Sequence, residues 1–200
     1  MGRERELEVL RDGFERAREG RGQVFSVVAE AGVGKSRLLH EFRKALAKED
    51  LTIVEGKCLS YGRGMAYHPL VEILKSSFEI QEGEEESEIR RKLKEGLKTL
   101  EIDEGVYLPF LLELFSVKDS GIEKIPLSPD ARKQRIMEAF KRILLKLAAP
   151  RPLVIVFEDL HWLDKSSEET LHSFLEIIPG ARILAVFTYR PEFVPPWNFK

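Results

Sequence analysis

The first sixty residues alternate between helical and strand-like patterns of apolar side chains. Helical spacing predicts one helix that ends before Gly20 and another that follows a glycine-containing loop. Short apolar runs over residues 24–28 and 51–58 predict two strands. The apolar positions of the two helices are Leu7, Leu10, Phe14 and Ala17, then Leu38, Leu39, Phe42 and Leu46. This half therefore reads as helix, strand, loop, helix and strand.

The middle of the chain, residues 67–147, has helical periodicity almost throughout. It predicts a large helical insertion between two strands, preceded by a glycine-bearing loop over residues 61–65. The sequence Ser128-Pro129-Asp130 predicts a helix start, with a capping hydroxyl and a proline in the first turn. The acidic run over residues 82–88 is expected to be a solvated loop or helix N-terminus, because nothing nearby fixes a metal-ligand geometry.

The last part of the chain predicts two more strands. Residues 153–157 are apolar without alternation, which is typical of a strand that is buried on both faces of a parallel sheet. A helix follows with Ser166 and Glu169 at capping-box spacing, then a strand over residues 183–187 and an irregular tail over 191–200. Strands alternating with helices predict an α/β fold with right-handed crossovers and a mainly parallel sheet.

The loop between the first strand and the second helix has the residues of a phosphate-binding loop. Backbone N–H groups over residues 30–36 can form a concave nest for phosphate, with the positive end of a helix behind them. Gly32 and Gly34 permit the unusual dihedral angles of such a turn. Lys35 is expected to contact the β and γ oxygens, and the Ser36 hydroxyl to bind Mg²⁺. The pattern asks for glycine where the chain has Ala29, but this position precedes the tight turn, so alanine is expected to be tolerated.

Two adjacent acids, Glu158 and Asp159, end the predicted buried strand. Magnesium needs a carboxylate near the phosphates, and the C-terminal end of a neighbouring parallel strand delivers one to that edge of the sheet. Strand alternation starts the two side chains toward different faces. We therefore expect one acid to serve the metal and the other to polarise the attacking water.

Four segments together resemble the AAA-type ATPase domains of the STAND class of signalling ATPases and transcriptional regulators. They are GREREL at residues 2–7, EAGVGKSRLL at 30–39, EDLHWLD at 158–164 and TYRPE at 188–192. The segment YHPL at 67–70 also looks like the family's stretch after its second strand. The resemblance covers essentially the whole chain and implies a P-loop NTPase three-layer sandwich, with the helical insertion placed before the Walker B strand.

The resemblance implies roles for the matching residues. Gly2-Arg3-Glu4 would lie against the adenine, Glu158 would hold Mg²⁺ at the Walker B position, and Asp159 would activate water. The assignment of the two acids can also be reversed, because the family commonly has aspartate where this chain has Glu158. Arg190 would sense the γ-phosphate. The nucleotide-binding residues would be Arg3, Glu30, Ala31, Gly32, Val33, Gly34, Lys35, Ser36 and Arg37, with Ser36 and Glu158 on the metal.

Packing or helix capping is expected for His161, Trp162 and Asp164 rather than catalysis. The resemblance also implies a single ATPase core over residues 1–200. We divide it into a nucleotide-binding half (1–60), the helical insertion (61–150), the Walker B and sensor half (151–190) and the tail (191–200). The family continues with a fifth strand and a helical lid, so we interpret the chain as an excised core or a minimal version.

Composition narrows the function further. The net charge is −2 with 43% hydrophobic residues and a single cysteine, which is typical of a globular protein from a reducing compartment and excludes an internal disulfide framework. There is no signal peptide and no apolar run of about 18 residues, so we expect a cytoplasmic protein without membrane contact. DNA binding through this domain is disfavoured because no basic face or winged helix is visible.

The predicted function is an ATP/ADP-dependent and Mg²⁺-dependent regulatory switch with slow hydrolysis. Its partners would be the nucleotide and either other domains of a longer protein or regulatory proteins, with a homo-oligomer left open. One alternative is a nucleotide-dependent interaction scaffold with negligible turnover. Another is a DNA-linked ATPase of the origin-recognition type, which salt-sensitive DNA binding would reveal. The sequence does not separate ATP from GTP.

Overall fold

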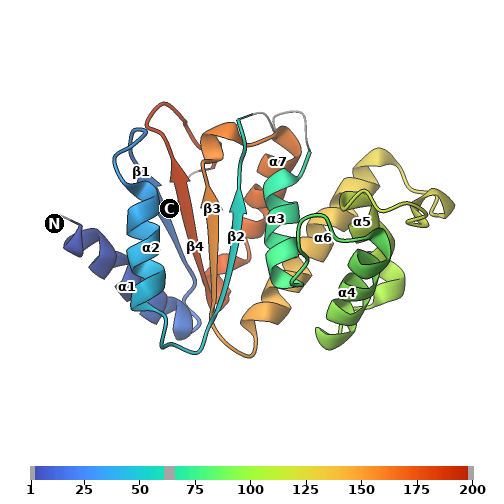
Figure 1. The fold of residues 1–200 in the computed structure, drawn as a ribbon, viewed down its shortest axis with the longest axis horizontal. Helices are drawn as coiled ribbons and strands as arrows, with labels where there is room; N and C mark the ends of the chain where they lie inside the picture. The colour runs from blue at the N-terminus through green and yellow to red at the C-terminus, as the bar shows by residue number, and fades with distance from the viewer. Residues whose placement is uncertain (1–2, 61–65, 198–200) are drawn as a thin grey trace.

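Four parallel strands form the central sheet of the computed structural model, which describes residues 3–60 and 66–197. The strands are β1 (Gln23–Val28), β2 (Thr52–Lys57), β3 (Leu153–Glu158) and β4 (Ile183–Tyr189), in the order β1-β4-β3-β2. All four predicted strands are confirmed. β4 extends past the predicted end at residue 187, because Thr188 and Tyr189 pair with Val27 and Val28 of β1. The C-terminal ends of all the strands therefore meet at one edge of the sheet (Figure 1).

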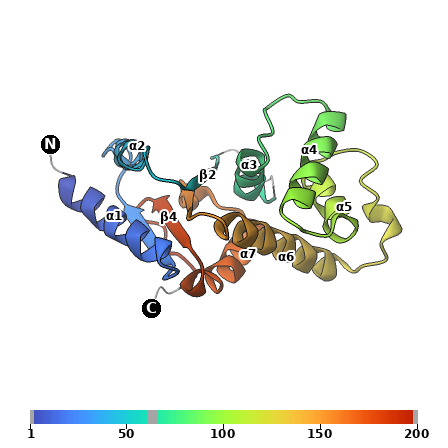
Figure 2. The same cartoon turned by 90° about the horizontal axis from the view of Figure 1, so that it is seen from below.

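Helices cover both faces of this sheet, which confirms the predicted α/β sandwich (Figure 2). On one face, α1 (Glu4–Arg18) and α2 (Lys35–Ala45) share a core with one set of alternating strand residues, among them Val154 and Val156. On the other face lie α3 (His68–Ser77), α6 (Pro129–Ala148) and α7 (Lys165–Leu175). α1 approaches β1 so closely that a Cβ on Gly13 would lie 2.1 Å from the Phe25 ring.

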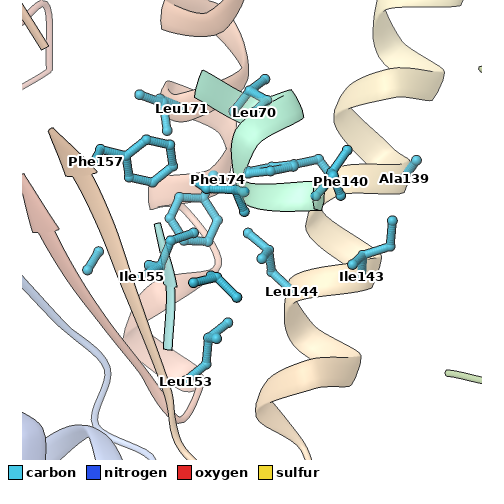
Figure 3. Packing of buried hydrophobic residues seen from close by; sticks show 14 of the residues in the cluster. Leu70, Ala139, Phe140, Ile143, Leu144, Leu153, Ile155, Phe157, Leu171 and Phe174 are labelled. Atoms are coloured by element: carbon cyan, nitrogen blue, oxygen red, sulfur yellow. The ribbon is translucent and has the colours of Figure 1, made fainter. Parts of the chain in front are cut away.

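The larger core lies between β3, β4 and the second helical layer. Phe174 of α7 is located between Phe157 of β3 and Phe140 of α6, with ring centroids 6.3 and 6.0 Å away (Figure 3). Phe187 of β4 packs edge-on against Phe157 at 5.4 Å. These four rings are all at most 1% exposed. Because β3 and β4 are buried on both faces, their ends are held rigidly where the candidate site begins.

The helical insertion between β2 and β3 has two parts. Its first and last helices, α3 and α6, pack on the sheet and belong to the sandwich, whereas α4 (Glu86–Thr99), α5 (Glu104–Leu114) and the 3₁₀ turn η2 (Ile122–Lys124) form a lobe beyond them (Figure 2). The acidic run is confirmed as a loop and helix start, and Glu84 pairs with Lys92 at 2.5 Å. Within residues 3–60 and 66–197, no group of three or more His, Cys, Asp or Glu side chains could hold a metal ion.

Two predicted helix starts have different outcomes. Ser128 caps α6 as predicted, with its Oγ accepting from the Ala131 N–H at 3.2 Å. The predicted capping box at Ser166 and Glu169 is wrong, because α7 begins one turn position earlier and Asp164 caps it. The Asp164 carboxylate accepts from the Ser167 N–H at 2.9 Å and from the Tyr67 N–H at 3.3 Å. The 3₁₀ turns η3 (Leu160–Trp162) and η4 (Ile178–Gly180) flank α7.

Some predictions fall outside the described residues. These are Gly2 of the opening motif, the loop over residues 61–65 and the end of the tail over 198–200. None of the helices that the structure describes is long and apolar enough to cross a membrane.

Candidate functional site

The loop between β1 and α2 has the backbone geometry of a phosphate nest. Gly32 and Gly34 have φ angles of +79° and +90°, the left-handed region that glycine adopts readily. Gly34 is also the residue before the first turn of α2, so Lys35 and Ser36 supply free N–H groups at the positive end of that helix. A Cβ on Gly32 would meet nothing within 4 Å. Backbone conformation, not crowding, is therefore what requires glycine here.

Ala29, where the motif asks for glycine, continues the strand. Its N–H donates to the Tyr189 carbonyl at 3.3 Å, and it is not among the residues with positive φ. This geometry agrees with the prediction that alanine is tolerated.

The Lys35 ammonium folds back over the loop. Its Nζ donates to the carbonyl oxygens of Ala29 at 2.6 Å and Glu30 at 3.0 Å. Ser36 follows it in α2, and its side chain is exposed at the mouth of the loop, as are residues 30–33 and Arg37. The nest is thus open to solvent, and the lysine already lies across it.

The two predicted acids lie at the end of β3, on the same sheet edge as the loop (Figure 1). Glu158 accepts from Arg43 Nη2 of α2 at 3.3 Å and is 20% exposed. Asp159 has a left-handed backbone with φ +60°, and its N–H donates to the Thr188 hydroxyl of β4 at 3.0 Å. Its carboxylate is 3.9 Å from Lys57 Nζ. The acids thus have different neighbours, as two divided roles would need.

Arg190 directly follows β4 and lies at this edge as well. Its guanidinium is 5.9 Å from the centroid of the Trp162 ring and 3.8 Å from a Glu192 carboxylate oxygen. His161 stacks at 5.1 Å on Trp162. Burial, and secondly the charge of Arg190, lower the pKa of His161 below its usual value of 6.5. Together with the Asp164 cap, these contacts support packing roles for the three residues of the signature.

A cavity of about 380 Å³ lies beside the loop, between α1 and α2. Arg3 lies at its border, and its guanidinium donates to the Val33 carbonyl of the loop. Glu4 and Leu7 line the cavity from α1, and Arg37, Leu38 and Glu41 from α2. Lys35, Ser36 and Glu158 are not among its lining residues, so the cavity adjoins the phosphate nest without including it.

The structure therefore places the predicted residues in two neighbouring groups. The loop, Glu158, Asp159 and Arg190 follow three neighbouring parallel strands, and Arg3 and Arg37 border the cavity. An open nest, a displaceable ammonium and a nearby carboxylate fit Mg²⁺ bound with a phosphate ligand, with Ser36 and Glu158 as the protein groups on the metal.

Sequence reasoning missed two neighbours of the acids, Thr188 and Arg43. Thr188 was part of a recognised motif but had no assigned role. Arg43 is seven residues after Ser36, which is two helical turns, so helical spacing alone puts it on the same face of α2.

Comparison with known proteins is consistent with this geometry. The family described as AAA ATPase domain matches residues 1–186. An uncharacterized protein of Rhizobium meliloti (strain 1021) is 26% identical over 201 residues, which cover 98% of this chain and 19% of that protein. The chain thus spans about a fifth of the length of the curated relative it matches.

Proposed function

The chain belongs to the AAA ATPase domain family, and from that premise we propose that it is a nucleotide-dependent switch of the STAND class with slow, Mg²⁺-dependent ATP hydrolysis. Family membership points to nucleotide binding. The single observation that supports the finer proposal is the edge of the sheet where the glycine loop, Glu158 with Asp159, and Arg190 follow three adjacent parallel strands.

The residues divide the binding of a nucleoside triphosphate. Free N–H groups of the loop and of the first turn of α2 would take the phosphates, and the base would enter the cavity that Arg3 borders. Lys35 would exchange its two carbonyl partners for phosphate oxygens. Bound Mg²⁺ would neutralise phosphate charge, held by Ser36 and Glu158. Asp159 would orient water, and the reversed assignment of the two acids is the alternative to test.

The switch depends on Arg190. Its guanidinium rests between Trp162 and Glu192, and it is 37% exposed, so it can turn toward a γ-phosphate. ADP offers no such partner, and the two nucleotides would therefore favour different positions of Arg190. In a longer protein, that difference would be passed to other domains, to regulatory partners or to further copies of the chain.

Binding of a fluorescent ribose-labelled ADP tests the nucleotide site. Charge-assisted hydrogen bonds contribute about 1.5–3 kcal/mol, but Lys35 gives up two carbonyl contacts, so Lys35→Ala should weaken binding by about tenfold. Lys94→Ala, at an exposed ion pair of the distant lobe, is the matched control and should change nothing. Equal affinity of wild type and Lys35→Ala would refute the site.

Turnover and the ATP/ADP difference test the switch. Arg190→Gln should weaken ATP more than ADP, and Asp159→Asn should abolish multiple turnover while nucleotide still binds. If the wild type binds nucleotide but never turns it over, the interaction scaffold is the better description. Competition by GTP in the same assay reports the preference for the base.

A further inference from the structure

One guanidinium lies between two carboxylates next to the proposed metal site. Arg43 of α2 donates through Nε to Glu55 of β2 and through Nη2 to Glu158 of β3, the latter at 3.3 Å. The three side chains are 32%, 38% and 20% exposed. The group is therefore half-buried, with one positive and two negative charges.

The sheet register explains why these groups meet. β2 and β3 are parallel, with Glu55 opposite Val156 and Lys57 opposite Glu158. Ile53 and Val156 pack in the core under α1 and α2, so alternation directs Glu55 and Glu158 to the same face. Arg43 lies about 12 Å along α2 from Lys35, and helical side chains point back toward the N-terminus. Its guanidinium thus reaches the carboxyl end of β3.

The pairing puts Glu158 in competition. A carboxylate that accepts from a guanidinium has fewer free lone pairs for a cation, and the positive charge of Arg43 opposes a second cation nearby. Glu55 offers Arg43 another partner at the same time. The strength of the Arg43–Glu55 contact therefore determines how easily Glu158 is released.

We infer that Arg43 and Glu55 form a release switch that sets the Mg²⁺ requirement of the site by controlling the availability of Glu158. Arg43 holds Glu158 when no metal is bound, and Glu55 retains Arg43 when Glu158 turns to the metal. This inference rests on the proposed function, because Glu158 matters only if Mg²⁺ and nucleotide bind at this edge. Arg43 and Glu55 are positioning residues that act through Glu158.

The switch predicts opposite effects for its two members. Arg43→Gln frees Glu158, so the Mg²⁺ concentration for half-maximal binding of fluorescent ADP should fall by about two- to fivefold, the range for partly exposed ion pairs. Glu55→Gln leaves Arg43 with Glu158 alone, so the Mg²⁺ requirement should rise by a similar factor. Binding in EDTA should be the same in both variants, because no metal then competes for Glu158.

Matched controls come from α4, where Arg91 is also located between two glutamates, Glu88 and Glu95. Arg91→Gln and Glu95→Gln make the same charge changes in the distant lobe (Figure 2). Neither should shift the Mg²⁺ requirement. Thermal unfolding without nucleotide checks that every variant is folded, and Glu55→Gln alone still tests the inference if Arg43→Gln is unstable.

A double-mutant cycle separates the switch from a simple electrostatic field. If Glu55 acts through Arg43, Glu55→Gln should have almost no effect once Arg43 is already glutamine. Shifts that simply multiply would overturn the inference, as would shifts in the same direction or no shift. Those results leave the proposed function intact when Lys35→Ala still weakens binding. A wild type that binds no nucleotide would instead overturn both.

Discussion

Asp164 offers a sharp test of whether the segment over residues 158–164 contains a structural or a catalytic aspartate. Its carboxylate caps α7, accepting from the N–H and the hydroxyl of Ser167 and from the N–H of Tyr67 at the start of α3. Ser167 is fully buried. Asp164→Ala would therefore remove a cap and also leave a buried hydroxyl without its acceptor.

The expected cost is the sum of these two losses. Removing an N-cap costs about 1 kcal/mol, and an unsatisfied buried hydroxyl costs about 1–3 kcal/mol. The Tyr67 contact, at 3.3 Å, adds little. The free energy of unfolding should therefore fall by about 2–3 kcal/mol, measured by urea denaturation with circular dichroism and tryptophan fluorescence as coincident probes.

Two further variants make this result interpretable. Asp103 caps α5 through a single bond to the exposed Gly105 N–H at 2.9 Å, so Asp103→Ala should cost only about 0.5–1 kcal/mol. Asp164→Asn keeps a cap acceptor and should retain most of the stability and any ATPase activity. Loss of turnover in Asp164→Asn at unchanged stability would refute the structural assignment, and so would an Asp164→Ala variant no less stable than Asp103→Ala.

Two other predictions concern the loop and His161. Gly34→Val should abolish nucleotide binding because φ +90° excludes a β-branched residue, whereas Ala29→Gly should change the dissociation constant by less than about threefold; fluorescent ADP titration checks both. His161 has a lowered pKa, so the unfolded chain takes up its proton first as the pH falls through 6.5. Its contribution to stability is present above that pH and lost below it; urea denaturation between pH 7.5 and about 5.5 should show a shallower decline in His161→Gln.

Local patterns were enough to predict the strands and the phosphate loop. The buried strand at residues 153–157 and the glycines of the loop announce themselves in sequence, because each depends on its own neighbours and not on distant residues. The family resemblance added the order of the motifs. It also placed the helical insertion before β3, which the structure bears out over the described residues.

Contacts between distant segments could not be predicted in this way. The cap of α7 was assigned to Ser166 because both Ser166 and Asp164 suit that role by type, and only the approach of Tyr67 and the buried Ser167 favour Asp164. The Arg43–Glu158 pair joins residues 115 positions apart. It depends on the pairing of β2 with β3 and on the position of α2 over the sheet, neither of which leaves a periodic signal in the sequence.

The charged groups of the site share one property that bears on its function as a switch. Lys35 contacts two loop carbonyls, Glu158 contacts Arg43, Arg190 lies between Trp162 and Glu192, and Arg3 contacts the Val33 carbonyl. A nucleotide with Mg²⁺ would therefore exchange existing contacts instead of filling unmet ones, and each exchange offsets part of the new interaction. Because a ligand shifts an equilibrium only by its differential affinity for the two states, small differences between ATP and ADP suffice when the exchanges nearly balance. The same balance lowers affinity for both nucleotides, which suits a domain that must release ADP to be reset.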